Sequence, residues 1–223
     1  MSRKLALLAA VSAVALLGAP LAAQAVQITL GGIATGINVQ GGVPVAGDVM
    51  ATIASPISGS SILNGLGADI FGNYTLGTVS ITAGPQTGEQ YPVSVQAPAS
   101  EAFTYSDASG NALTGDIHWS FIQDNTTNPK FFGQMTILAS SGSAGFTGAF
   151  IPGSVGGIDF TTTALGGGRT LDQLVAATAT VTVGVSSGEV VPGPIVGAGL
   201  PGLLAACGGL VALGRRRRRK QTA

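Results

Sequence analysis

Turn signals divide the middle of this chain into pieces that are short enough for single strands or hairpins. Between the turns, apolar and polar side chains alternate with the period of two that is typical of a strand with one buried face. The region is therefore predicted to be all-β, with no long helix. The predicted turns stand at Gly41-Gly42, Ser58-Gly59, Asn64-Gly65, Gly84-Pro85, Ser109-Gly110-Asn111, Ser141-Gly142, Gly156-Gly157 and Gly166-Gly167-Gly168.

The clearest alternation places Leu113, Ile117, Trp119 and Phe121 on one buried face of a strand. A single helical turn fits residues 170–174. The Gly-rich segment 26–66 is predicted to be an edge or swapped element, or to be partly disordered. Further strands are predicted at 74–82, 91–95, 131–138 and 175–185.

The predicted architecture of residues 26–189 is a β-sandwich of about eight to ten strands. The jelly roll is one form that the pattern allows, and closure into a barrel is the alternative. We expect this domain to be flanked by an N-terminal signal helix and a C-terminal transmembrane helix. The only cysteine, Cys207, lies outside the domain, so the domain must be held together by its core without disulfides.

The N-terminus has the three parts of a secretory signal peptide. A basic head at Arg3 and Lys4 precedes an apolar run over residues 5–17, and Ala23 and Ala25 form a small-x-small cleavage site. Residues 1–25 are therefore predicted to pass the chain to the secretion translocon and to be removed by signal peptidase.

The C-terminal segment 190–223 has the composition of a membrane anchor. Residues 195–214 carry no charge and are long enough to span a hydrocarbon core of about 30 Å as a helix. A basic tail follows and is expected to stay in the cytoplasm, which leaves the rest of the chain on the other side. The tail consists of Arg215, Arg216, Arg217, Arg218, Arg219 and Lys220.

The residues before this span form a short proline motif of Val191, Pro192, Gly193 and Pro194. Together with the stretch 197–203, the motif resembles the PEP-CTERM sorting signal of exported proteins in Gram-negative bacteria. The resemblance implies recognition by an exosortase, which is a membrane-embedded cysteine transpeptidase, and cleavage near the motif. It also implies release or transfer to the cell surface, often in a setting of extracellular polysaccharide. Gly193 stands where the signal usually has Glu, which makes this chain a variant of it.

The distribution of charge excludes several partners. All ten acidic residues lie between residues 26 and 189, where Lys130 and Arg169 are the only basic ones. Such an anionic surface is not expected to bind nucleic acid or anionic lipid.

Catalytic and metal-binding patterns are weak, and no cofactor, metal site or catalytic residue is predicted. His118 is the only histidine, and Asp116 lies two residues away on the same strand face, but no G-x-S-x-G motif accompanies them. The oxygen-rich stretch 124–128 has ligands that suit Ca²⁺, although Asp and Asn are equally typical of turns. We therefore predict that the protein is not an enzyme.

The predicted function is a non-catalytic structural or adhesive role at the cell surface or in the extracellular matrix. One alternative is a carbohydrate-binding module of the exopolysaccharide matrix, for which Tyr74, Tyr91 and Tyr105 are the candidate aromatic residues because alternation buries Trp119. The other alternative is an extracellular hydrolase, for which the residues are missing.

Overall fold

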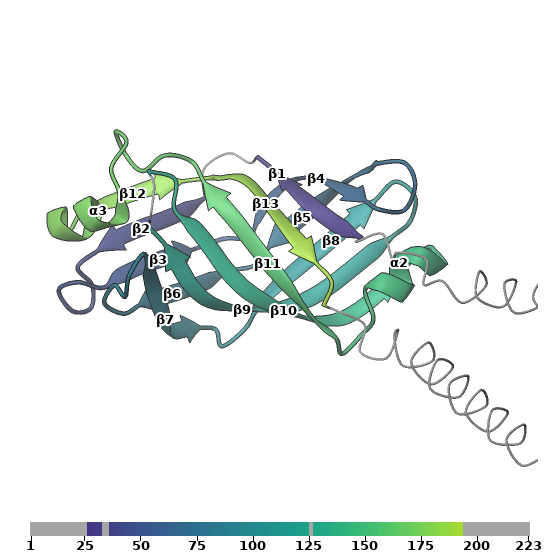
Figure 1. Cartoon of the computed structure of the whole chain (residues 1–223), viewed down its shortest axis with the longest axis horizontal. Helices are drawn as coiled ribbons and strands as arrows, with labels where there is room; N and C mark the ends of the chain where they lie inside the picture. Colours follow the sequence, from purple (N-terminus) through teal and green to yellow (C-terminus); the bar gives the residue numbers. More distant parts are fainter. Residues whose placement is uncertain (1–25, 33–35, 125–126, 194–223) are drawn as a thin grey trace, which may run out of the picture. The chain divides into compact units, whose positions relative to one another are not determined.

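The computed structural model describes residues 26–32, 36–124 and 127–193 (Figure 1). The predicted signal peptide with Ala23 and Ala25, the predicted transmembrane helix at 195–214 and the basic tail at 215–220 lie outside the described residues. Within the described ranges, no helix combines the length and apolarity that crossing a membrane requires. Residues Ala25–Gly193 form one compact unit.

Strands make up most of this unit. The described residues also contain two short helices, α2 (Ala144–Ala149) and α3 (Leu171–Ala177). The strands are β1 (Gln27–Gly31), β2 (Ile37–Gly41), β3 (Val49–Ile53), β4 (Ile57–Asn64), β5 (Ile70–Leu76), β6 (Val79–Ala83), β7 (Gln90–Ala97), β8 (Glu101–Asp107), β9 (Ala112–Gln123), β10 (Lys130–Ser141), β11 (Val155–Thr162), β12 (Thr180–Val183) and β13 (Val185–Val191).

Eight of the strands close into a ring. Around the ring the neighbours are β9, β10, β11, β13, β1, β4, β5 and β8, and β8 pairs again with β9. The predicted β-sandwich, jelly roll included, is therefore wrong, because the sheet is a closed barrel rather than two facing sheets. Closure gives each ring strand a hydrogen-bonding partner on both sides, which removes the free edges that a sandwich leaves.

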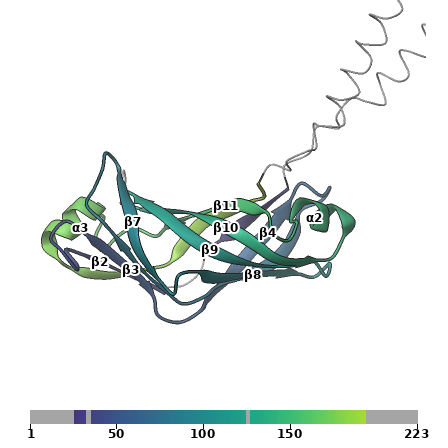
Figure 2. The ribbon, with the colours of Figure 1, turned by 90° about the horizontal axis from the view of Figure 1, so that it is seen from below.

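The remaining five strands extend the sheet beyond the ring. The first half of β9 pairs with β8, whereas its second half pairs with β7, from which β6, β3, β2 and β12 continue. Strand β9 can serve both neighbours because it is 12 residues long. Consecutive strands such as β3 and β4 lie one in the extension and one in the ring, so the chain passes repeatedly between the two (Figure 1; Figure 2).

The strand predicted over residues 175–185 is wrong in its first part, because helix α3 extends to Ala177. The Thr170 hydroxyl accepts a hydrogen bond from the Gln173 backbone, and the Gln173 side chain accepts one from the Thr170 backbone. This capping box starts a helix that continues past the predicted single turn to Ala177. Thr178 then adopts a left-handed conformation with φ of 47°, which ends the helix before β12.

The Gly-rich segment 26–66 also differs from its prediction. Its described residues supply β1 to β4, each paired on both sides within the sheet. Two predicted turns are wrong as well, since Ser58-Gly59 lies within β4 and Gly156-Gly157 lies within β11. Gly156 is required for another reason, because a Cβ there would meet the carbonyl oxygen of Val191 on β13 at 2.5 Å.

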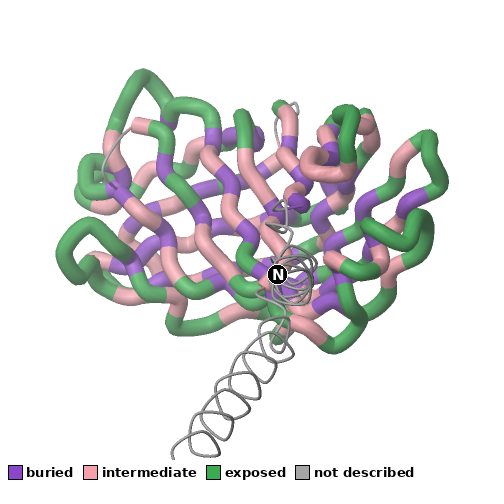
Figure 3. Tube along the Cα trace, turned by 45° about the vertical axis from the view of Figure 1, so that its right-hand side comes forward, coloured by how far each residue is buried: buried purple, intermediate pink, exposed green. Residues whose placement is uncertain are grey.

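Along most of the ring strands, buried residues alternate with intermediate or exposed ones, as the colours of Figure 3 show. The buried side chains fill the barrel interior. Trp119 lies edge-on to Phe131 and Phe160, with ring centroids 6.1 and 5.0 Å apart. Helix α2 adds the fully buried Phe146, which stacks on Tyr105 at 5.8 Å. An eight-stranded barrel is just wide enough for its own side chains to fill, and this one is packed with aromatic rings.

One carboxyl group is buried among these rings. Glu101 is 0% exposed, and its Oε2 accepts a hydrogen bond of 2.7 Å from Trp119 Nε1. Its Oε1 has no hydrogen-bond partner among the described residues. Burial raises the pKa of Glu101 to about 8, although the hydrogen bond from Trp119 opposes that shift. The group is therefore mostly protonated at neutral pH.

Candidate functional site

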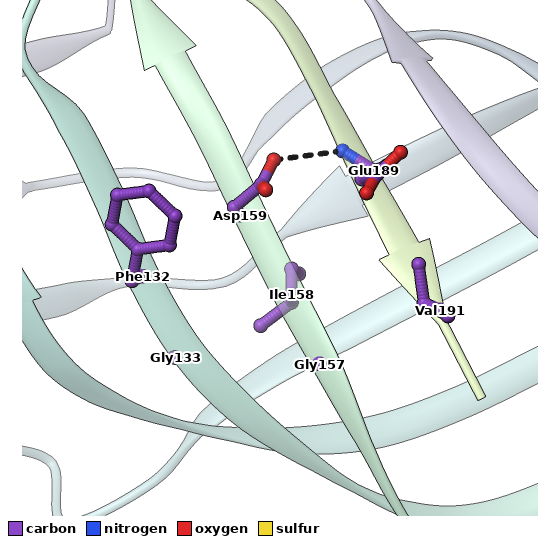
Figure 4. A pocket seen from close by; sticks show the side chains of 7 residues that line it. All are labelled: Phe132, Gly133, Gly157, Ile158, Asp159, Glu189 and Val191. Carbon is purple, nitrogen blue, oxygen red and sulfur yellow. Dashed lines mark hydrogen bonds between the residues drawn. The ribbon is translucent and has the colours of Figure 1, made fainter. Parts of the chain in front are cut away.

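A shallow hollow of about 140 Å³ lies on the outside of the barrel, over strands β10, β11 and β13 (Figure 4). Most small-molecule sites in proteins enclose roughly 300 Å³ or more, so this hollow suits part of a larger ligand lying on the surface. Its lining consists of Phe132, Gly133, Gly157, Ile158, Asp159, Glu189 and Val191.

The alternation of β11 places polar and apolar groups on opposite sides of the barrel wall. Ile158 and Phe160 are buried in the core, so Gly157 and Asp159 face outward. Register then aligns Asp159 with Phe132 on β10 and with Glu189 on β13. The result is an outward row that crosses the strands, with an aromatic residue followed by two acidic ones.

Glycine leaves the floor of the hollow open. A Cβ on Gly157 would have nothing within 4 Å, although its neighbours along the strand are enclosed. A ligand can therefore approach the backbone of β11 at this point, which a larger residue would prevent.

The two carboxyl groups are held by their surroundings. The Glu189 backbone donates a hydrogen bond of 3.3 Å to Asp159 Oδ1, and Gln27 Nε2 donates one of 3.0 Å to Glu189 Oε2. Burial raises the pKa of Asp159, while the Glu189 backbone and the charge of Lys130 oppose that shift. Each carboxylate can accept about four hydrogen bonds, so both keep free acceptor capacity toward the hollow.

A stacked aromatic pair adjoins the hollow. Phe121 on β9 lies over Phe132 with ring centroids 4.7 Å apart and an interplanar angle of 22°. The prediction that Phe121 shares the buried face of Trp119 is wrong. A β-bulge adds Ser120 to β9 opposite Phe132 and Gly133, and the extra residue turns Phe121 outward and Ile122 inward.

The tyrosines predicted as sugar-binding candidates lie in the core instead, so that assignment is wrong. Tyr74, Tyr91 and Tyr105 are each at most 2% exposed. Their hydroxyls reach the periphery of the core, where Tyr91 donates to Asp172 and Tyr105 donates to Asp107. Burial raises the pKa of Tyr74 to about 12, and Trp119 is buried as predicted.

The pair His118 and Asp116 lies on the outer face of β9, as alternation predicts, and no hydrogen bond joins the two in the described part of the chain. Asp124 has a structural role, because its carboxylate accepts hydrogen bonds of 2.7 and 2.9 Å from the backbones of Leu171 and Asp172. It thereby satisfies free donors at the start of α3. The described residues hold no cluster of three potential metal ligands, and residues 125–126 of the predicted loop lie outside them.

The proline motif begins within the sheet. Val191 is the last residue of β13, where it pairs with Gly157 and lines the hollow. Pro192 and Gly193 follow directly, whereas Pro194 lies outside the described residues. The barrel therefore reaches the motif without a spacer.

Comparison of the chain with protein-family models, with curated proteins and with solved structures finds no match.

Proposed function

We propose that this chain is an exported, exosortase-processed protein of the Gram-negative cell surface or extracellular matrix, with a non-catalytic adhesive role. Its barrel binds extracellular polysaccharide through the hollow on β10, β11 and β13. The translocon and signal peptidase act on the N-terminal segment, and the apolar C-terminal segment anchors the chain transiently until the exosortase cuts near Val191 to Pro194.

The observation that supports polysaccharide binding is the row of Phe121, Phe132, Asp159 and Glu189 across four adjacent strands. A sugar ring has an apolar C–H face and an edge of hydroxyl groups. The half-buried ring of Phe132 complements the first, and carboxylate acceptors complement the second. The row offers both chemistries side by side, next to the open space over Gly157.

The acidic pair also bears on hydrolysis, which is the second candidate function. Glycosidases use two carboxyl groups on either side of the bond that breaks. Here both groups lie on the same open surface, and Glu189 is held by Gln27 rather than free to attack. Binding without cleavage is therefore the better interpretation, and release of new reducing ends from a bound polysaccharide would contradict it.

Replacing Phe132 by Ala is expected to weaken binding to polysaccharide about tenfold, because it removes the aromatic ring that lines one side of the hollow. Affinity electrophoresis of residues 26–193, which contain the whole core described above, measures the effect. Phe71→Ala is the matched control, since Phe71 is 72% exposed on β5 and does not line the hollow. Equal retardation of the two variants in the polysaccharide gel would count against the site.

A further inference from the structure

We propose that the hollow selects neutral polysaccharides over acidic ones, and that the bound polysaccharide lies across the strands rather than along them. This inference rests on the proposed function. Charge, acceptor chemistry and strand spacing each contribute to this inference.

The charges around the hollow disfavour an anionic ligand. Asp159 and Glu189 line it, and Lys130 is the one cation among the described residues whose charge acts on Asp159. The other basic residue of the domain, Arg169, lies in the turn bridged to Leu165 and is absent from the lining. A uronate, sulfate or phosphate group on the ligand would be repelled by these two acidic side chains, and no basic residue of the described ranges lines the hollow to offset the repulsion.

The hydrogen-bonding groups point to hydroxyl donors on the ligand. A carboxylate only accepts hydrogen bonds, and those to ionised acceptors are the stronger kind. The Gln27 amide already donates to Glu189, and the Asn64 amide on the next strand donates to Thr29 at 2.9 Å. A neutral sugar supplies hydroxyl donors at every ring, whereas an acidic sugar replaces some of them with acceptors.

The register sets the direction of the ligand. The row passes from Phe121 on β9 through Phe132 on β10 and Asp159 on β11 to Glu189 on β13. Neighbouring strands are about 4.8 Å apart, which is close to the length of one sugar ring in an extended chain. A chain across the strands can therefore place one ring over the phenylalanines and the next rings over the two carboxylates.

The test compares the retardation of residues 26–193 in gels that contain a neutral glucan, either laminarin or hydroxyethylcellulose, with that in gels that contain alginate. We expect a neutral glucan to retard the protein at least tenfold more strongly than alginate does. The double variant Asp159→Asn, Glu189→Gln should lose that preference by binding the glucan at least tenfold more weakly. Thermal unfolding of the variant checks that the barrel remains intact.

The outcomes separate the inference from the function on which it rests. Stronger binding to alginate than to both glucans would overturn neutral selectivity and leave polysaccharide binding in place. Glucan binding that the double variant does not change would overturn the assignment of the carboxylates as acceptors. Failure to bind any of the three polysaccharides would overturn the proposed function itself.

Discussion

Raising the pH from about 5 to about 8 is expected to lower the free energy of unfolding by on the order of 4 kcal/mol because of Glu101 alone. Burial raises the pKa of this group from an ordinary value of 4.5 to about 8. Between these values the folded state keeps a proton that the unfolded state has lost, so higher pH favours unfolding. The stabilising contribution of Glu101 is fully present below its ordinary pKa of 4.5, and it is lost once the pH exceeds its raised pKa of about 8.

The matched variant is Glu101→Gln, which keeps an oxygen to accept the Trp119 hydrogen bond and cannot ionise. We expect its stability to change much less with pH and to exceed that of the original chain at about pH 8. Urea unfolding followed by fluorescence measures this, because Trp119 is the only tryptophan. Parallel pH profiles for the two proteins would show that Glu101 titrates at its ordinary pKa.

Replacing Gly157 by Val is expected to abolish polysaccharide binding while leaving the barrel folded. A Cβ at this position meets nothing within 4 Å, and β-branched residues suit a strand, so the stability should change by less than about 1 kcal/mol. The new side chain would occupy the hollow beside Phe132 and Asp159. Affinity electrophoresis and thermal unfolding, measured on the same preparation, report the two effects separately.

Two other glycines serve as controls for Gly157→Val. Gly148→Ala adds a side chain in open space on α2, away from the hollow, and should change neither binding nor stability strongly. Gly156→Val places a side chain against the Val191 carbonyl, so it should destabilise the barrel by about 1–3 kcal/mol or more. Undiminished binding by a well-folded Gly157→Val variant would show that the ligand site lies elsewhere.

The all-β class follows from the turn residues and from the alternation between them, which are local signals. Closure is not local, because it depends on β9 pairing with β10 along its whole length and with β7 and β8 on its other side. A strand with one buried face looks the same in a sandwich and in a barrel. The period-two pattern over 175–185 predicts a strand, but the capping box of Thr170 and Gln173 starts helix α3, which occupies the first part of that range.

The candidate site cannot be predicted from the sequence either, because it also depends on how distant strands pair. The bulge at Ser120 reverses the face of Phe121, and a single extra residue in one strand has no clear signal in the alternation. Tyr74, Tyr91 and Tyr105 are candidates in the sequence only because alternation buries Trp119, and the structure buries all three in the core as well. Asp159 and Glu189 stand far apart in the sequence, and only the pairing of β11 with β13 brings them together. The pair Gly156-Gly157 is the available signal of a close approach to the backbone, but a glycine pair is equally typical of a turn.

The most direct test of the account is the intact mass of the protein that a soluble neutral glucan releases from the extracellular matrix of the producing cells. We predict a processed barrel that begins near Val26 and ends close to Pro192, without the basic tail. Recovery of a full-length chain that keeps Arg215 to Lys220 and stays with the membrane despite the glucan would contradict both its sorting and its adhesive role.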